Sequence, residues 1–455
     1  MSTRSALGLP PFMRKGRLVP FLTVAVSGEV LYSAFEAFKG ALMIPLQEML
    51  GISQTQFGLL MTYVGLALFF YLPAGWINNR FRVRTIILCS LGWRLVTYLV
   101  LFLLDPPFGL MAAIAVTWAI VDAIVWPAVA NGVCVLAADE DQKGRGLAMG
   151  LLESIRRFGL TIVLLYLNWQ LSLIVVLMFL PDATTTVMRV FAIAYTLLIV
   201  PMMIAVVRYV PDTRIATQAR ASHSVAALKG LLHVLSRPRI WLAGIAAMTV
   251  YWADINLMYV SAPYLQQVFH VSTAMSGAFG LLNTGLVAIV AGVVSGIVSD
   301  YVFKSSTRMM AVALGCVAVT CGLVLLLPVT RVMIIPILVL LIVVALATFL
   351  GKSVILAPIG ELELPEEIAG SAMAVGSFLA YASILWGYNL NGYLLDSHAS
   401  DPAAGYRIIF MITAGVTVIG CATAVILDRV NRRAAMRVDT VDGAADAGDR
   451  TAADS

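Results

Sequence analysis

The sequence predicts an all-α membrane protein with twelve transmembrane helices in two pseudo-symmetric six-helix bundles. Of the 455 residues, 60% are hydrophobic and 12% are charged, and the mean hydropathy is +0.93, values far from those of soluble proteins. Apolar runs long enough to cross a bilayer follow one another along the chain. Backbone groups in hydrocarbon must find partners within their own segment, so these runs are expected to be helices.

The two-bundle arrangement follows from an internal repeat. A serine followed five residues later by a glycine occurs as Ser53 and Gly58, and again as Ser272 and Gly277, about 220 positions further on. Repeated membrane halves with matching turn residues are typical of alternating-access carriers. The repeat therefore predicts a transporter.

Proline, glycine and charged residues bound the individual apolar runs, which give the expected helices in order. The spans lie at 18–44, 56–78, 84–104, 109–136, 146–168, 188–208, 240–262, 274–299, 308–328, 333–357, 371–394 and 405–428. They divide the chain into a cytoplasmic N-terminus at 1–17, a first bundle at 18–208, a cytoplasmic central loop at 209–237, a second bundle at 238–428 and a cytoplasmic tail at 429–455.

Three further segments carry signals of their own. Residues 169–181 are apolar but too short to cross a bilayer, so they either extend the fifth span or lie at the outer surface. In the central loop, valine and leucine recur at helical spacing from Val225 to Leu235, which predicts a short amphipathic helix at the membrane surface. From Val438 to Ser455 the tail is rich in Asp and Ala without apolar periodicity, so we expect it to be disordered.

The positive charges indicate the orientation. With both termini cytoplasmic, most Lys and Arg residues fall inside, and the outer loops hold little beyond Arg189, Arg331 and Arg407. We therefore expect a multi-pass protein of the cell membrane, acting as a monomer, whose partners are the lipid bilayer and a small-molecule substrate. Because the charges flank spans, we expect no nucleic-acid binding. The cysteines and histidines form no metal-ligand pattern, so we expect neither a metal nor a cofactor.

Ionisable residues inside the expected spans are the candidates for function. Each costs about 2.5–3.5 kcal/mol at the bilayer centre, so most are expected to face a hydrated cavity or one another. They are Glu29, Glu36, Lys39, Arg94, Asp122, Glu153, Arg156, Arg157, Asp254 and Lys352. Span one carries a polar stripe at i, i+3, i+7 and i+10, on one face of a helix: Glu29, Tyr32, Glu36 and Lys39. We assign Tyr32, Glu36 and Lys39 to substrate binding, and expect Glu36 and Lys39 to pair.

The remaining charges suggest one structural pair and one coupling site. Arg94 and Asp122 lie at similar depth in spans three and four, which predicts an ion pair between them. Proton coupling, if present, needs an intramembrane acid. Asp254 is the first choice because no basic residue lies near it in its own helix, and Glu29 and Asp122 are the others. The alternative is that Asp254 pairs across the cavity with Lys352, Lys39 or an arginine, and stays ionised.

The loop after the second span resembles the signature of the major facilitator superfamily, Gly-x-Leu-Ala-Asp-Arg-x-Gly-Arg-Lys. Here it reads Gly75-Trp-Ile-Asn-Asn79-Arg80-Phe-Arg82-Val-Arg84, with Asn79 in place of the acid and Arg82 in place of glycine. A second copy, Gly296-Ile-Val-Ser-Asp300, keeps the acid but has Tyr301 where arginine is expected. The resemblance implies the twelve-helix fold and an inner gate formed by Gly75, Asn79, Arg80, Arg84, Gly296, Asp300 and Arg308.

Within the superfamily, residues 144–157 and 365–370 resemble the sugar-phosphate-permease-like branch, which is similar to the organophosphate:anion antiporters. Those antiporters bind phosphate with one arginine in span one and one in span seven. The corresponding stretches here carry Lys39 and Asp254, so phosphate selectivity does not carry over.

The family's central cavity is lined by spans one, four, seven and ten. The resemblance therefore adds Trp126, Asn256 and Lys352 to the expected substrate-binding residues. At the start of span five, Arg156 and Arg157 point about 100° apart, so only one can face the cavity, and we assign Arg157 to it.

The sequence thus predicts a secondary active transporter that moves a small polar, anionic solute, such as a carboxylate or a sugar phosphate, by alternating access. One alternative is a proton-coupled carrier of a neutral or cationic solute, because the intramembrane charges divide equally between acids and bases. Another is a receptor or assembly protein with a carrier fold. No nucleophile–base pair can be recognised, so we do not expect an enzyme.

Overall fold

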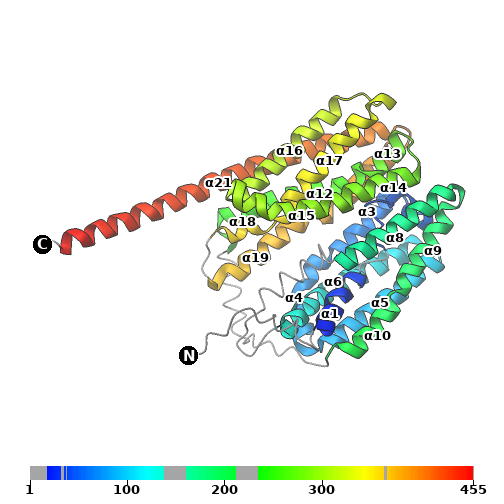
Figure 1. Ribbon diagram of the computed structural model, residues 1–455, viewed down its shortest axis with the longest axis horizontal. Helices are drawn as coiled ribbons and strands as arrows, with labels where there is room; N and C mark the ends of the chain where they lie inside the picture. Colours follow the sequence, from blue (N-terminus) through cyan, green and yellow to red (C-terminus); the bar gives the residue numbers. More distant parts are fainter. Residues whose placement is uncertain are drawn as a thin grey trace.

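The computed structural model describes residues 18–31, 35–36, 38–137, 160–211, 234–362 and 366–453. Within these ranges the regular elements are all helices. They form two bundles that lie against each other, one from each half of the chain, and α21 projects beyond one end of them (Figure 1). Each of the twelve expected spans contains helix in its described residues, which is the predicted all-helical, two-bundle fold.

The first bundle is organised around one long central helix. Its helices are α1 (Leu18–Leu31), α2 (Met43–Leu50), α3 (Gln54–Gly65), α4 (Ala67–Arg80), α5 (Val83–Leu103), α6 (Phe108–Ala137), α8 (Leu160–Phe179), α9 (Thr184–Leu197) and α10 (Ile199–Tyr209). α6 packs against α1, α3, α4 and α5. Together α3 and α4 form the second span, and α9 and α10 form the sixth.

The second bundle repeats this plan around α12. Its helices are α12 (Pro238–Val260), α13 (Ala262–Val268), α14 (Thr273–Leu281), α15 (Val287–Ile297), α16 (Ser306–Leu326), α17 (Ile334–Ser353), α18 (Ala357–Gly360), α19 (Glu366–Tyr381), α20 (Gly387–Ser397) and α21 (Pro402–Ala453). α12 packs against α17, α19 and α21. Two π-helical turns, Leu282–Leu286 and Val298–Phe303, lie within the eighth span.

Several spans are interrupted helices, which affects how many can be recognised by length. Eight helices in the described residues are long and apolar enough to cross a bilayer, or nine when α2 and α3, bent by 98° at their junction, count as one span. The eleventh span is broken between α19 and α20 by a 3₁₀ turn at Ala382–Leu385. Breaks of this kind expose backbone groups, and they are tolerated at membrane depth where they face protein or a hydrated cavity.

The structure corrects two sequence-based expectations and decides a third. The first expected span, 18–44, is not one helix, because α1 ends at Leu31 and residues 35, 36 and 38–41 form turns and a loop before α2.

The tail expected to be disordered continues α21 as helix to Ala453, projecting beyond the bundles (Figure 1). Alanine, abundant there, has the highest helix propensity. α8 reaches Phe179, so the apolar piece at 169–181 extends the fifth span. Most of the predicted amphipathic helix of the central loop lies outside the described residues.

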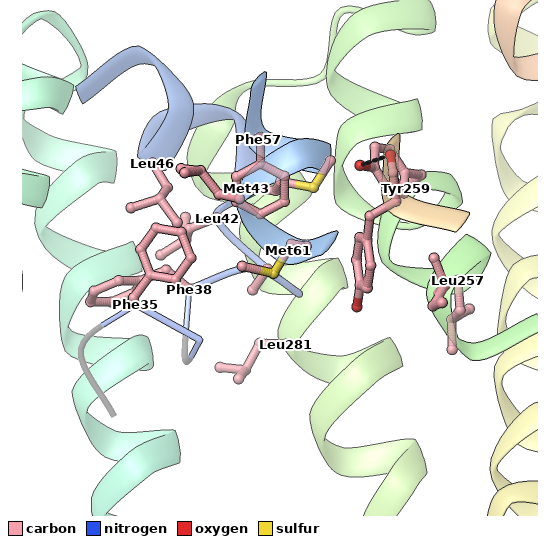
Figure 2. Packing of buried hydrophobic residues seen from close by; sticks show 14 of the residues in the cluster. Phe35, Phe38, Leu42, Met43, Leu46, Phe57, Met61, Leu257, Tyr259 and Leu281 are labelled. Atoms are coloured by element: carbon pink, nitrogen blue, oxygen red, sulfur yellow. Dashed lines mark hydrogen bonds between the residues drawn. The ribbon is translucent and has the colours of Figure 1, made fainter. Parts of the chain in front are cut away.

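The two bundles meet at the end opposite the one from which α21 projects, called the distal end below (Figure 1). Figure 2 shows the apolar cluster there, in which Phe38, Leu42 and Met61 from the first bundle gather with Leu257 and Leu281 from the second. All five side chains are nearly inaccessible to solvent. Burial of this apolar surface seals the contact between the bundles at the distal end.

Candidate functional site

Glu36 and Lys39 lie on the turns between α1 and α2, not on a continuous helix face with Glu29 as the sequence predicted. α1 ends at Leu31, and Tyr32 falls outside the described residues. The expected pairing does occur, since Lys39 Nζ lies 3.2 Å from Glu36 Oε2. Each side chain of this pair remains 24% exposed. The turn therefore presents one cation and one anion at a site that solvent can reach.

A second ion pair lies in the other bundle, between α12 and α17. Lys352 Nζ is 2.7 Å from Asp254 Oδ2, and the Asp254 side chain is only 5% exposed while that of Lys352 is 36% exposed. The expectation that Asp254 stands without a cation is therefore wrong, and the alternative pairing with Lys352 is the one found. Asp254 Oδ1 has no hydrogen-bond partner among the described residues. This carboxylate thus has an unused acceptor in a poorly hydrated place.

The two pairs belong to one electrostatic site that spans the bundles. Coulombic interactions link Lys39 to Tyr251 and Asp254 of the second bundle. Lys39 Nζ also lies 5.9 Å from the ring centre of Tyr388, and Lys352 Nζ lies 5.6 Å from that of Tyr251. Aromatic rings at these distances stabilise ammonium groups by cation–π attraction. Opposite halves of the repeat therefore each contribute a lysine to the same region.

Two tyrosines of the eleventh span complete the aromatic lining and were not assigned from the sequence. The rings of Tyr251 and Tyr381 meet edge to face with centres 4.9 Å apart. Tyr388 is buried beside Tyr259, whose hydroxyl donates to the Tyr388 carbonyl oxygen at 3.0 Å. Tyr381 ends α19 and Tyr388 lies in the first turn of α20, on either side of the 3₁₀ turn. Their seven-residue spacing, which on an unbroken helix would put them on one face, was the signal available in the sequence.

Asn256 is buried between α12 and α20 instead of facing an open cavity. Its Oδ1 accepts a hydrogen bond from Asn391 Nδ2 at 3.0 Å, and its Nδ2 donates to the Trp252 carbonyl oxygen at 2.8 Å. The residue is 1% exposed. In this conformation Asn256 holds two helices together and has no direct access to a solute.

Arg94 and Asp122 form the ion pair that the sequence predicts across spans three and four. Arg94 Nη2 lies 2.5 Å from Asp122 Oδ1, with side chains 0% and 8% exposed. The guanidinium also donates to the Tyr98 hydroxyl at 3.2 Å and stacks over the Trp118 ring at 4.6 Å. A pair this enclosed by its own bundle is suited to a structural role, because solvent and solute do not reach it.

Trp126 and Glu29, which the sequence also assigned to function, have their described contacts within the first bundle. Trp126 on α6 is partly exposed and lies beside α1, where a Cβ on Gly28 would be 3.8 Å from its ring. The charge of Glu29 acts on Tyr195 of α9, within the first bundle. Arg157 lies outside the described residues.

The helices that carry the expected inner gate bring it to the end of the bundles from which α21 projects (Figure 1). Arg80 is exposed and Arg84 half-buried, whereas the side chains of Asn79 and Asp300 fall outside the described residues, as do the surroundings of Gly75. Gly296 lies on α15, where a Cβ would meet nothing within 4 Å. Arg308 Nε lies 3.4 Å from Asp428 of α21, and its Nη1 donates to the Phe303 carbonyl oxygen at 3.1 Å. Arg308 therefore bonds within its own bundle.

Glu361 is a structural anchor at this end that the sequence did not reveal. Its Oε1 accepts from the Ser306 amide, and its Oε2 accepts from the Thr307 hydroxyl at 2.6 Å. The carboxylate thus caps the first turn of α16, where an anion is stabilised by the unpaired amides. Only the folded chain brings these positions together, since they are more than 50 residues apart.

Comparison with known proteins identifies the family. The sequence model of the Major Facilitator Superfamily matches residues 26–388. The chain belongs to the Major Facilitator Superfamily. This major facilitator protein is accordingly a membrane transporter, and its two bundles are the two halves of the family's fold.

Two curated relatives of this transporter are proteins of Escherichia coli (strain K12). Inner membrane protein YihN is 26% identical over 242 residues, which are 52% of this chain and 57% of YihN, little more than half its length. Inner membrane protein YqcE is 24% identical over 389 residues, covering 83% of this chain and 86% of YqcE.

Solved major facilitator structures share the fold at low sequence identity. The nucleoside transporter NupG superposes with a TM-score of 0.68 at 11% identity, covering 90% of this chain and 98% of NupG. A bacterial homologue of the human lysosomal transporter Spinster, in an inward-facing and occupied conformation, gives a TM-score of 0.68 at 15% identity, with 93% and 98% covered.

Proposed function

We propose that this transporter is a secondary carrier of the cell membrane that moves a small polar solute with an anionic group by alternating access. The observation that carries the proposal is that Lys39 of the first bundle lies over the ring of Tyr388, while Lys352 of the second lies over that of Tyr251, which packs against Tyr381. An alternating-access carrier needs a solute site shared by its two halves. The location is supported by YihN and YqcE, both named as inner membrane proteins.

An anionic solute can bind by exchanging partners with the two carboxylates. Lys39 and Lys352 are each partly exposed and already held by an acid, so a carboxylate or phosphate group can displace Glu36 or Asp254 without leaving an ammonium unpaired. The displaced Asp254 would then lose its cation in a poorly hydrated place, and a proton would be the replacement for the lost positive charge. Solute binding and proton binding are coupled by this exchange, which makes proton symport the simplest driving force.

A second candidate is a carrier of a neutral or cationic solute. The ion pairs Lys39–Glu36 and Lys352–Asp254 favour this candidate, because the two lysines and two acids together carry no net charge at the site. In that case the lysines neutralise the acids, and the tyrosine rings and hydroxyls make the main contacts with the solute.

The test compares binding and transport in one set of purified variants. Carboxylates, sugar phosphates, sugars and amines are screened by thermal shift, and stabilising solutes are then tested as labelled substrates for uptake into proteoliposomes. We expect Lys39→Ala and Lys352→Ala each to lower uptake of an anionic solute at least about tenfold, because a charge-assisted hydrogen bond of about 1.5–3 kcal/mol is lost. The matched control is Arg331→Gln, an exposed cation at the distal surface.

Three results would contradict parts of the proposal. Normal uptake by both lysine variants would remove the assigned site. Stabilisation by sugars or amines alone would favour the second candidate. Binding without uptake of any solute by the wild-type protein would indicate a receptor with a carrier fold.

A further inference from the structure

The closest contact between the two bundles is a seam between α3 and α20. On α20, Tyr388 and Gly392 lie four residues apart, on one helical face. A Cβ on Gly58 of α3 would collide with the Tyr388 carbonyl oxygen, and a Cβ on Gly392 would collide with the Gln54 carbonyl oxygen. The two backbones therefore touch directly, with no room for side chains between them.

Asp396 is the next residue in the four-residue series and lies at the distal end of the seam. Its Oδ1 accepts a hydrogen bond from the Gln54 amide at 3.2 Å, and its Oδ2 accepts from the Thr55 amide at 2.8 Å. These are the first two amides of α3, which a helix cannot pair internally. The carboxylate of one bundle thus caps a helix of the other.

The first turn of α3 is built so that these two amides remain available. Ser53 Oγ accepts from the Gln56 amide at 3.2 Å, and Gln56 Oε1 accepts from the Ser53 amide at 3.0 Å, forming a capping box within the first bundle. Among the described residues, this local cap leaves the amides of Gln54 and Thr55 without a partner in their own bundle. Asp396 completes the cap with both oxygens and a negative charge at the positive end of the helix dipole.

The equivalent helix in the other half of the repeat has no such cross-bundle cap. At the start of α14, Ser272 Oγ accepts from the Met275 amide at 3.4 Å. Within the described ranges, no carboxylate of the first bundle accepts from the first amides of α14. The polar contact across the distal end is therefore concentrated at the seam between α3 and α20.

We infer that Asp396 is a latch that holds the distal end of the transporter closed, and that its two hydrogen bonds must break whenever this end opens. The inference rests on the alternating access proposed above. Opening would separate α20 from α3 and expose the amides of Gln54 and Thr55, so losing the latch should favour the distally open state.

The latch stays charged at neutral pH. Partial burial disfavours the ionised carboxyl, but hydrogen bonds from Thr55, Ser53 and the Gln54 amide outweigh this and hold the pKa of Asp396 below its ordinary value of 3.8. The latch therefore opens by separation of the bundles, not by protonation under ordinary conditions.

The experiment measures the distance between the bundles at the distal end in the full-length protein. Leu104 and Val332, which are 69% and 79% exposed, are replaced by cysteine in a background without the five native cysteines, and are spin-labelled in liposomes. We expect Asp396→Ala to raise the population of the longer distance by about fivefold to tenfold, as expected for loss of a helix cap. Asp396→Asn should have a smaller effect, because its amide oxygen still accepts one hydrogen bond.

A matched control separates the latch from an ordinary helix cap. Asp401 also caps a helix at the distal end, since its Oδ1 accepts from the Ala404 amide at 3.2 Å, but both belong to the second bundle. Asp401→Ala should leave the distance distribution unchanged. Hydrogen exchange should accelerate at Gln54 and Thr55 in Asp396→Ala, and near Ala404 in Asp401→Ala.

Two outcomes would overturn the inference. If exchange at Gln54 and Thr55 accelerates in Asp396→Ala while the distances stay the same, Asp396 is only a cap. If Asp401→Ala lengthens the distances equally, the effect is not specific to the seam. If Asp396→Ala does not fold, the same distances are measured in Asp396→Asn instead. Unchanged distances in that variant would count against the latch. These distances need no solute, so they remain informative even if the proposed substrate class is wrong.

Discussion

At the scale of single residues, two of the ion pairs that link separate helices, Arg94–Asp122 and Lys352–Asp254, differ in exposure, and this suggests different roles. Arg94 and Asp122 are enclosed by their own bundle, whereas Lys352 is 36% exposed beside Asp254. Removing one partner of an enclosed pair leaves a buried charge uncompensated. A partly exposed pair can instead exchange partners with water or a solute. The first pair is therefore suited to hold the fold, and the second to take part in a transport cycle.

We expect a double-mutant cycle on Arg94 and Asp122 to be strongly non-additive. Arg94→Gln and Asp122→Asn should each destabilise the protein by about 3–5 kcal/mol, because each leaves one buried charge unpaired. The double variant should lose less than the sum, with a coupling energy of about 0.5–3 kcal/mol. The free energy of unfolding is measured for the four proteins in detergent. Additive losses of stability would refute the pairing.

Asp254→Asn tests whether the exchangeable pair couples transport to protons. The amide cannot bind a proton, so we expect pH-driven accumulation of solute to disappear while exchange at equal pH on both sides continues. Uptake into proteoliposomes with and without an imposed pH gradient measures both quantities. A variant that still concentrates solute in response to the gradient would exclude Asp254 as the coupling site.

At the scale of elements, close packing between the bundles decides where helices break. The chain leaves helical geometry between α1 and α2 where it approaches the second bundle. A Cβ on Gly280 would lie 2.8 Å from the Ala41 Cα, and one on Gly40 would lie 2.7 Å from Thr284 Oγ1. The break brings the turn that carries Glu36 and Lys39 to the interface between the two bundles. A straight helix along the first bundle was not predicted to place these residues there.

Substitution by alanine should have opposite effects on stability at two helical glycines, Gly58 in the seam between α3 and α20 and Gly415 outside it. Gly58→Ala should destabilise the protein by at least about 1–3 kcal/mol, because the added Cβ meets the α20 backbone, which cannot move aside like a side chain. Gly415→Ala on α21 should stabilise by about 0.5–1 kcal/mol, since its Cβ meets nothing within 4 Å and alanine favours helix. Thermal unfolding of both variants provides the check. Equal effects at the two positions would contradict the close contact.

At the scale of the whole molecule, α21 projects from one end of the two bundles and the seam lies toward the other (Figure 1). We expect the end from which α21 projects to be cytoplasmic, because it carries the Arg80, Arg84 and Arg429–Arg433 clusters. A reporter that folds only in the cytoplasm should be active when fused after Ser455. The same reporter inserted near Asp401, at the distal end, should be inactive. The reverse pattern would invert the proposed orientation.

The sequence by itself determined the membrane class, the helical composition, the two-half repeat, the family and the Arg94–Asp122 pair. These features rest on local properties, namely apolar length, turn residues and charges at matching depth, which the bilayer constrains without knowledge of the tertiary contacts. The same local rules misjudged span one, because the break there depends on its approach to the second bundle.

Only the tertiary structure decided which partners the functional side chains have. Asp254 meets a lysine 98 residues away, and Asp396 meets amides 341 and 342 residues away. The rotation and depth of each helix set these contacts, and a residue's neighbours along its own helix say nothing of them. Asn256 was assigned to the cavity by its span, yet the rotation of α12 turns it toward Asn391. A stripe on one helix thus predicts a polar face, and the packing of the other helices decides what that face meets.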